Sequence, residues 1–276
     1  YFKSKRNGGD VMEIKLSHIK TAKLNDVSIN IPSSVITGVT GTNQEEILKV
    51  ISFSNEFSGN IYFDKERVTK KKQDYYKSKI YYVPLEFNLE YPLYTVEEYL
   101  RYFILSNSSK IVNIDEKVVG ALKIVGLDKS LLKRTITTLS SSEKKWFQLS
   151  LAFLYNPEIL LLENPFIYFD EKEKAKLIRI LERLKDKFHK TIIITSDNQD
   201  LLYEITRYLV ILKDGKLYQE GLTESIYYYL FNEKELGYEL PKIVSFIKLV
   251  EKMKKIKLDH RKDIKDLMKD IYREVK

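Results

Sequence analysis

The sequence predicts an α/β fold in which helices pack against a mainly parallel sheet. In three places a helical pattern adjoins a short apolar run, namely at residues 35–48, 139–162 and 171–195. Short apolar runs beside helical patterns are typical of parallel strands buried on both faces. Alternating apolar residues between positions 13 and 31 indicate an additional pair of antiparallel strands.

The central stretch, residues 139–170, contains signals for the start and for the end of a helix. Three serines, Ser140 to Ser142, precede Glu143 and a run of apolar residues at helical spacing. We expect the hydroxyl of Ser140 or Ser141 to accept unpaired N–H groups there, and Glu143 to favour the positive end of the helix. Pro157 disfavours helical geometry at Asn156, so the helix is expected to end at that residue.

A buried strand is expected directly after this helix. The run from Ile159 to Leu162 is too short for a helix and too apolar for a sheet edge. Glu163 follows it at the carboxyl end, the position where open α/β sheets bind ligands.

Composition limits the class of protein. A chain of 276 residues can bury a core of one or two domains. The absence of cysteine excludes disulfides and thiolate metal sites and fits a reducing compartment. Apolar runs stay well below the roughly 18 residues of a membrane span. No secretory signal is visible, so we expect a soluble or peripheral protein.

The net charge of +8 is concentrated near the C-terminus. Residues 242–276 contain 12 Lys or Arg and 6 Asp or Glu, which gives a net charge of +6. A solvated helical face explains this excess most simply, and contact with an anionic membrane surface or an acidic partner is the next alternative. Nucleic acid is the weakest alternative, since no known binding module accompanies the charge.

The central stretch resembles the signature helix and Walker B strand of ATP-binding-cassette (ABC) ATPases. That family has L-S-G-G-Q before the helix and Asp-Glu-Pro after the strand. In this chain the signature positions are occupied by Leu139, Ser140, Ser141, Ser142 and Glu143. Glu163 replaces the metal-associated Asp, and Asn164 replaces the catalytic Glu. Asn164 cannot accept a proton at neutral pH, so the resemblance implies a scaffold without its catalytic base.

A second segment resembles the Walker A loop, G-x-x-x-x-G-K-[ST]. Its residues are Gly38, Thr40, Gly41, Thr42, Asn43, Gln44, Glu45 and Glu46. Gly38 and Gly41 match the family, whereas Gln44 replaces the phosphate-binding Lys and Glu45 the metal-binding hydroxyl. One unit charge about 4 Å from another is worth roughly 4 kcal/mol at an effective dielectric near 20. We therefore expect weak triphosphate binding, with Glu45 and Glu46 capping the helix and filling its anion site.

Further family positions are also replaced. Leu85 stands where the family has a nucleotide-sensing Gln, and a shift of one residue would place Glu86 there. Ser196 replaces the switch histidine, and Asp170 matches the aspartate of the dimer loop. For the adenine-stacking aromatic only His18 is a conceivable substitute, and an ordinary exposed histidine is the simpler interpretation.

The C-terminal segment narrows the resemblance. A Leu240-Pro241 pair, an amphipathic helix, a basic connection and a second helix from about Asp263 resemble the end of energy-coupling-factor (ECF) transporter ATPases. The resemblance implies a P-loop NTPase (RecA-like) parallel sheet core, an antiparallel β subdomain, a helical signature subdomain and a small C-terminal helical domain. We predict a cassette at 12–222, with helical residues at about 95–150, and a dimerisation-type domain at 223–276. Residues 1–11 are expected to be a spurious leader before a natural start at Met12.

The resemblance implies a catalytically degenerate subunit of an ECF-type importer of vitamins or metal ions. Its partners would be a second cassette, in a hetero- or homodimer, and a transmembrane T-type subunit at the cytoplasmic face of the membrane. ATP and Mg2+ are expected by resemblance only, with none in the chain's own site and Glu163 as a weak metal candidate. Two alternatives stay open: an active ATPase with displaced catalytic residues, or an interaction protein that retains the fold.

Overall fold

The computed structural model describes residues 12–87, 91–107, 113–232, 239–255, 258 and 264–274. The expected leader at 1–11 therefore lies outside the described residues, as do Gly237, Tyr238 and Asp263. Among the described residues, no helix combines the length and the apolar character that a membrane crossing requires.

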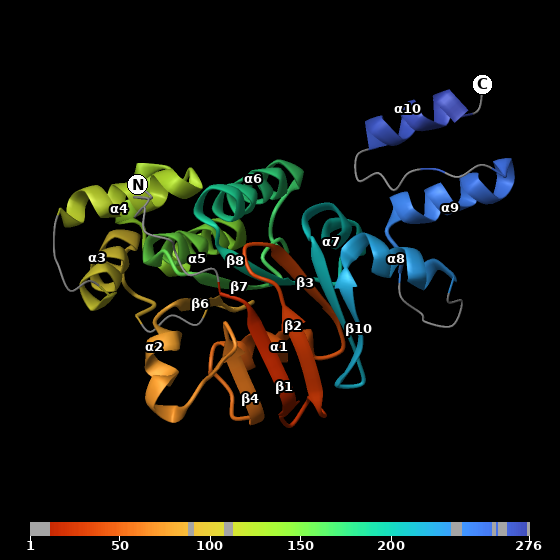
Figure 1. Cartoon of the computed structure of the whole chain (residues 1–276). Helices are drawn as coiled ribbons and strands as arrows, with labels where there is room; N and C mark the ends of the chain where they lie inside the picture. The colour runs from red at the N-terminus through yellow and green to blue at the C-terminus, as the bar shows by residue number, and fades with distance from the viewer. Residues whose placement is uncertain are drawn as a thin grey trace.

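A six-stranded sheet forms the centre of the molecule, in the order β10-β9-β3-β8-β7-β6 (Figure 1). Its strands are β3 (Ile36–Gly41), β6 (Ile80–Val83), β7 (Ile159–Glu163), β8 (Thr191–Thr195), β9 (Tyr208–Lys213) and β10 (Lys216–Leu222). Neighbours are parallel except β9 and β10, which form an antiparallel hairpin through Asp214 and Gly215. Both turn residues have positive φ, at 52° and 73°, as a tight hairpin requires.

An antiparallel sheet packs beside this core in the order β2-β1-β4-β5. It consists of β1 (Ile14–Lys20), β2 (Val27–Ile31), β4 (Ser58–Phe63) and the short β5 (Glu66–Arg67). Apolar residues of this sheet, of helix α1 (Gln44–Ile51) and of the central sheet share one buried cluster. The alternation expected between residues 13 and 31 is thus an antiparallel pair whose inward residues cover α1.

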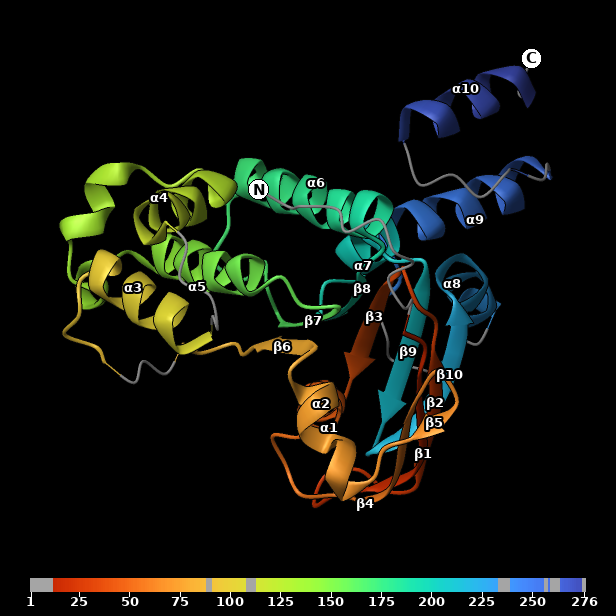
Figure 2. The same cartoon turned by 60° about the vertical axis from the view of Figure 1, so that its left-hand side comes forward.

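A helical arm extends from the edge of the central sheet at β6 and β7 (Figure 2). It contains α3 (Val96–Asn107), α4 (Ile114–Val125) and α5 (Ser141–Tyr155), and two 3-10 turns, Lys129–Lys133 and Ile136–Thr138, lie between α4 and α5. The helix expected in the central stretch is confirmed as α5, which ends before Asn156. Asn156 adopts a left-handed conformation with φ of 57°.

The other face of the central sheet is covered by α6 (Glu171–Phe188), with α7 (Gln199–Ile205) and α8 (Thr223–Asn232) nearby. A short helix, α2 (Gln73–Lys77), precedes β6. Buried residues of α8, namely Ile226, Tyr227 and Leu230, belong to the main core cluster. The predicted boundary at 222/223 therefore assigns a helix of the main core to the C-terminal segment.

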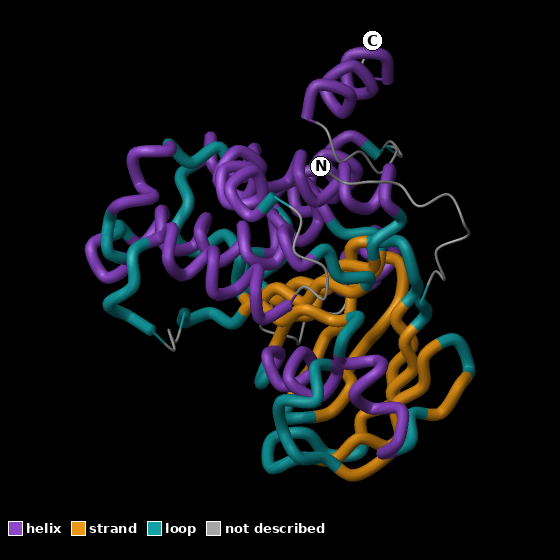
Figure 3. Tube along the Cα trace, turned by 90° about the vertical axis from the view of Figure 1, so that its left-hand side faces the viewer, coloured by secondary structure: helices purple, strands orange, loops and turns teal. Residues whose placement is uncertain are grey.

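Two helices, α9 (Lys242–Lys254) and α10 (Ile264–Glu274), follow α8 and lie at the periphery (Figure 1). The last helix, next to the C-terminus, projects from the rest of the molecule (Figure 3). Ile247, Leu258 and Leu267 form a small buried cluster of their own. Val244 reaches back into the main core. Both helices predicted for this segment are confirmed.

Candidate functional site

The carboxyl ends of the parallel strands bring the Walker-like positions together. After β3 the chain turns through Gly41 and Asn43 into α1, and Thr42 donates its N–H to the Leu212 carbonyl at 3.2 Å. Gly41 has a φ of 103°, and a Cβ atom there would lie 1.9 Å from the Leu212 carbonyl oxygen. Only glycine fits this close approach, so the turn that builds the loop is retained.

Gln44, at the position of the phosphate lysine, is buried and bonded within the chain. Its Nε2 donates to Asp197 Oδ1 at 2.7 Å, which joins α1 to the segment after β8. Its Oε1 is also buried and has no hydrogen-bond partner among the described residues. An unpaired carbonyl oxygen can accept a hydrogen bond but repels a phosphate oxygen.

The two acids of α1 behave differently from each other, and the expectation that both cap the helix is wrong for Glu46. Glu46 is 3% exposed and accepts a hydrogen bond from Asn55 Nδ2 at 2.9 Å. Glu45 is held by Lys23, whose Nζ lies 2.8 Å from Glu45 Oε1. That hydrogen bond raises the pKa of Lys23 above its ordinary value. Partners outside α1, 22 residues away for Glu45 and nine residues away for Glu46, decide where these carboxylates point.

Glu163, at the end of β7, is bonded to the strand beside it. Its Oε2 accepts a hydrogen bond from the Tyr82 hydroxyl and one from the Leu85 N–H at 3.2 Å. Burial, followed by the hydrogen bond to Glu163, raises the pKa of Tyr82. The Walker-B-like carboxylate and the sensor-loop position Leu85 therefore form one local network.

Asn164 and Ser196, at the positions of the catalytic Glu and the switch histidine, directly follow β7 and β8. Asn164 has a φ of 41° and donates its N–H to Thr195 Oγ1 at 3.1 Å. Ser196 is 6% exposed, and its hydroxyl accepts the N–H of Asn198 at 3.1 Å. The backbone of Asn164 and the hydroxyl of Ser196 are thus held by β8 and the turn that follows it.

The signature residues lie at the start of α5, and the capping residue is Ser140. Glu143 N–H donates to Ser140 Oγ at 3.2 Å, and Ser140 N–H donates to Glu143 Oε2 at 2.8 Å. Ser142 donates to Glu173, which also accepts from the Trp146 ring nitrogen at 2.9 Å. Leu139 is buried, and Ser141 is exposed at the first helical position.

Asp170 caps α6 in the same way as Ser140 caps α5. Its Oδ1 accepts the Glu173 N–H at 2.8 Å, and its own N–H donates to Glu173 Oε2 at 3.2 Å. Glu173 therefore joins the signature helix to the dimer-loop position. Sequence reasoning missed this residue, although Asp170 and Glu173 have the spacing of a capping box.

Lys145 is a second residue that sequence reasoning missed. It lies on α5, is 2% exposed, and donates to Pro84 O at 3.1 Å and Gln148 Oε1 at 3.0 Å. Burial lowers its pKa to about 8. This lysine attaches the signature helix to the loop after β6, which carries Leu85.

Lys23 and Asp197 were also not predicted as site residues. Lys23 lies in the connection between β1 and β2, where the family resemblance suggested an adenine-stacking group. His18, considered for that role, is exposed and contacts Asp26 through Nδ1 at 2.8 Å. Asp197 directly follows Ser196, so its place next to the switch-histidine position is the one sequence signal that points to it.

This edge is a poor match for a magnesium triphosphate. The cation expected at position 44 is an amide already bonded to Asp197, and Glu163 is engaged by Tyr82 and Leu85. Lys23 supplies a positive charge, but Glu45 neutralises it. Within the described ranges, no group of three or more His, Cys, Asp or Glu could hold a metal ion.

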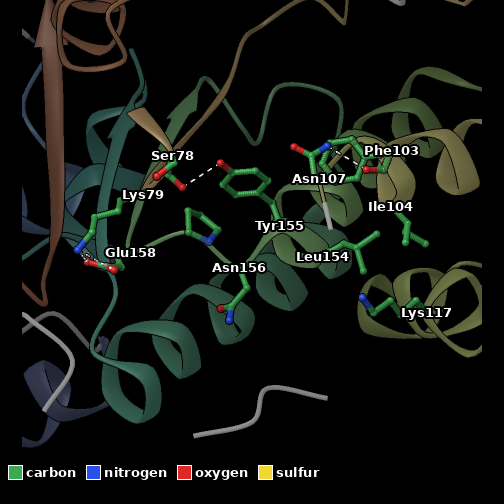
Figure 4. A pocket seen from close by; sticks show the side chains of 11 residues that line it. Ser78, Lys79, Phe103, Ile104, Asn107, Lys117, Leu154, Tyr155, Asn156 and Glu158 are labelled. Carbon is green, nitrogen blue, oxygen red and sulfur yellow. Dashed lines mark hydrogen bonds and ion pairs between the residues drawn. The ribbon is translucent and has the colours of Figure 1, made fainter. Parts of the chain in front are cut away.

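A separate cavity of about 390 Å³ lies at the opposite ends of β6 and β7 (Figure 4). Its polar side chains bond within the protein: Lys79 Nζ lies 3.2 Å from Glu158, and the Tyr155 hydroxyl donates to Ser78 O at 2.9 Å. These contacts join the end of α5 to the start of β6. We interpret them as part of the connection between the helical arm and the central sheet.

Comparison with known proteins identifies the class. The profile of the family described as "ABC transporter" matches residues 24–167. The chain belongs to this family, whose cassettes bind ATP with Mg2+, dimerise and work with transmembrane subunits. The resemblance inferred from the signature and Walker segments is thereby confirmed at the level of the family.

Curated relatives agree with this assignment. An ABC transporter ATP-binding protein of Listeria monocytogenes is 26% identical over 227 residues, covering 80% of this chain and 84% of that protein. The sulfate/thiosulfate import ATP-binding protein CysA of Bacillus cereus is 27% identical over 216 residues, covering 74% of this chain. The chain spans 58% of the length of CysA.

Solved structures confirm the fold. The dimeric ATP-binding cassette MJ0796, bound to ADP and Pi, matches with a TM-score of 0.68 at 20% identity, covering 76% of this chain and 98% of that one. The structure of cbiO1 from Clostridium perfringens, part of the ABC transporter complex cbiONQ, matches with a TM-score of 0.66 at 18% identity. It covers 87% of this chain and 100% of that one. The predicted P-loop NTPase fold is therefore confirmed.

Proposed function

We propose that this chain is a catalytically degenerate ATP-binding-cassette subunit of an ECF-type membrane importer of vitamins or metal ions. It serves as the structural or regulatory partner of a second cassette and docks a transmembrane subunit. In this role it is a pseudo-ATPase, peripheral to the cytoplasmic face of the membrane.

One observation carries this proposal: Gln44, where the family has its phosphate lysine, is buried and bonded to Asp197. A triphosphate binding at this loop would meet an amide instead of a cation, with two acids on the first turn of α1. Replacing one attraction by one repulsion at about 4 Å changes the interaction by several kcal/mol at an effective dielectric near 20. Since about 1.4 kcal/mol is a tenfold change in affinity, we expect a loss of several orders of magnitude.

The residue at the position of the catalytic base, Asn164, supports the loss of ATP hydrolysis. A general base has to accept a proton from the attacking water, and the amide of Asn164 cannot do so at neutral pH. Glu163 retains a carboxylate, but its Oε2 accepts hydrogen bonds from Tyr82 and Leu85. Neither residue is therefore proposed as catalytic.

The capped start of α5, which keeps Leu139 and Ser140 of the signature, supports a role toward a second cassette. Ser140 is exposed at the N-terminus of α5, and Asp170 caps α6 beside it through Glu173. Ile167 and Tyr168, in the loop before Asp170, expose 57% and 45% of their surfaces. We propose that the partner cassette covers this edge, so that the positive end of α5 faces the nucleotide bound to the partner.

The ECF-type assignment and the docking of a T-type subunit rest on two weaker supports. The likeness to cbiO1, a part of the cbiONQ complex, extends over 87% of this chain. The two C-terminal helices α9 and α10 agree with the tail pattern that suggested the subfamily. We place the docking surface at residues 85–94, of which 88–90 lie outside the described residues.

Nucleotide binding by the purified chain tests the proposal. We expect no magnesium-dependent ATP binding at micromolar concentrations in titration calorimetry. The double variant Gln44→Lys with Glu45→Ser restores the lysine and hydroxyl of the family loop and is expected to bind more tightly than the wild type. Micromolar, magnesium-dependent binding of ATP to the wild-type chain would contradict the proposal.

One observation favours the alternative of an active ATPase with displaced residues. Lys23 brings a cation to Glu45 at the start of α1, close to where the missing lysine would act. In that case the purified chain would hydrolyse ATP, and both Lys23→Gln and Glu163→Ala would abolish turnover. Failure to co-purify with any membrane subunit would instead favour the non-transport interaction protein.

A further inference from the structure

A groove away from the Walker-like edge has the features of a ligand site. It lies between the end of α1, the β4–β5 hairpin and a 3-10 turn at Lys70–Lys72, a region seen below the central sheet in Figure 2. Its volume is about 870 Å³, within the range of about 300–1,000 Å³ usual for small-molecule sites. The groove is large enough for a mononucleotide-sized molecule.

Two cations on one wall lack acidic partners. Neither Arg67 nor Lys70 forms an ion pair within the part of the chain that the structure describes. The neighbouring acid, Glu66, is already bonded to Lys72 and to the Tyr76 hydroxyl. The charged residues that line the groove are Arg67, Lys70 and Glu56, so the lining carries a net charge of +1.

Two aromatic side chains also line the groove. Phe53 and Phe57 are half-buried, and their ring centroids lie 6.4 Å apart with the planes tilted by 39°. Exposed faces of two phenylalanines offer a surface on which a flat ring can pack. A groove lined by two phenylalanines and by two cations without ion-pair partners among the described residues suits a ligand with both a ring and an anionic group.

We propose that this groove binds a small aromatic molecule that carries a phosphate group. Arg67 and Lys70 contact the phosphate, and Phe53 and Phe57 contact the ring. This site is separate from the Walker-like loop and does not depend on the proposed loss of ATP hydrolysis. The cavity in Figure 4 is different, because its Lys79 is already paired with Glu158.

Asn55 gives the groove a direct connection to α1. This residue lines the groove, and its Nδ2 donates to the buried carboxylate of Glu46 at 2.9 Å. A ligand that moves Asn55 therefore changes the surroundings of Glu46, on the helix that follows the Walker-like loop. Occupancy of the groove would be transmitted to that loop without nucleotide in it.

Titration calorimetry on the full chain tests the proposal, with AMP as the probe and EDTA present to remove metal ions. We expect AMP to bind, and adenosine and inorganic phosphate each to bind more weakly, because each lacks one half of the ligand. Arg67→Gln and Lys70→Gln should each weaken AMP binding by roughly tenfold or more, as loss of a charged hydrogen bond does. Phe57→Leu should weaken AMP and adenosine while leaving the binding of phosphate unchanged.

Lys71→Gln provides the matched control, because Lys71 is an exposed neighbour of Lys70 that does not line the groove. Its AMP affinity should stay within about twofold of the wild type, since screened surface charges contribute little. Three outcomes would overturn the proposal: no AMP binding, equal weakening by Lys71→Gln, or binding only of a poly-glutamate peptide through Arg67 and Lys70. Binding that Gln44→Lys changes but Arg67→Gln does not would place AMP at the Walker-like loop and overturn it as well.

Discussion

Two helix starts at the edge of the central sheet differ in how their first turns are held. α5 begins with a capping box formed by Ser140 and Glu143, so its N-terminal N–H groups are bonded locally. α1 begins at Asn43 in a left-handed conformation, without a side-chain cap, and its acids point to Lys23 and Asn55. The family scaffold is thus retained at α5 by local contacts and at α1 by backbone geometry and distant partners.

The largest effect on stability is expected from a substitution in the backbone turn before α1. Gly41→Ala forces a methyl group against the Leu212 carbonyl in a left-handed backbone region, and we expect a loss of roughly 3 kcal/mol or more in unfolding free energy. Gly120→Ala is the control, since nothing lies within 4 Å of the added Cβ on α4. Alanine there should stabilise the protein by roughly 0.5–1 kcal/mol. Denaturant titration measures both, and similar stabilities for the two variants would contradict the assigned turn.

The pH dependence of stability tests the burial of Lys145, on α5. Its pKa in the folded protein is about 8, below the ordinary value of 10.5, because burial disfavours the charged form. The unfolded chain therefore holds this proton more tightly, and the contribution of Lys145 to stability should rise as the pH increases from about 8 to about 10. Relative to Lys145→Met, which has no titrating group, the wild type should gain roughly 2–3 kcal/mol over that range. Parallel pH profiles of the two proteins would show that Lys145 is not buried.

The smallest effect is expected at the α5 cap itself. Ser140→Ala removes the acceptor of the Glu143 N–H and should cost roughly 1 kcal/mol in unfolding free energy. Ser141→Ala is the matched control, because Ser141 is an exposed neighbour at the first helical position. Its change should stay within about 0.5 kcal/mol, as for ordinary surface substitutions. Equal losses in the two variants would show that the cap lies one residue later than assigned.

The fold could be predicted largely because its signals are local. The run from Ile159 to Leu162, the Asp214-Gly215 turn and the spacing of Ser140 and Glu143 each act within a few residues. The same holds for Thr95, whose hydroxyl accepts the Glu98 N–H at 3.2 Å at the start of α3. Patterns of this kind determine where helices and strands begin and end.

The partners at the site could not be predicted in this way. Gln44 and Asp197 are 153 residues apart in sequence, and Lys23 and Glu45 are 22 apart, so only the completed topology brings them together. The wrong expectation for Glu46 has a different cause: a helix-dipole argument predicts an acid near the N-terminus, but it does not show that the chain turns back after α1 and brings Asn55, nine residues on, to this carboxylate. Lys145 was missed because a buried lysine without a carboxylate partner is uncommon.

The position of Trp146 gives the molecule a natural optical reporter. It is the single tryptophan of the chain, and its ring is stacked on Phe169 at 4.5 Å and lies 4.5 Å from Lys176 Nζ. Its ring nitrogen donates to Glu173, the carboxylate shared by α5 and α6. Because this indole is stacked on Phe169, which directly follows the exposed residues Ile167 and Tyr168, its fluorescence should respond when another protein binds there. Assembly could then be followed without attaching a dye.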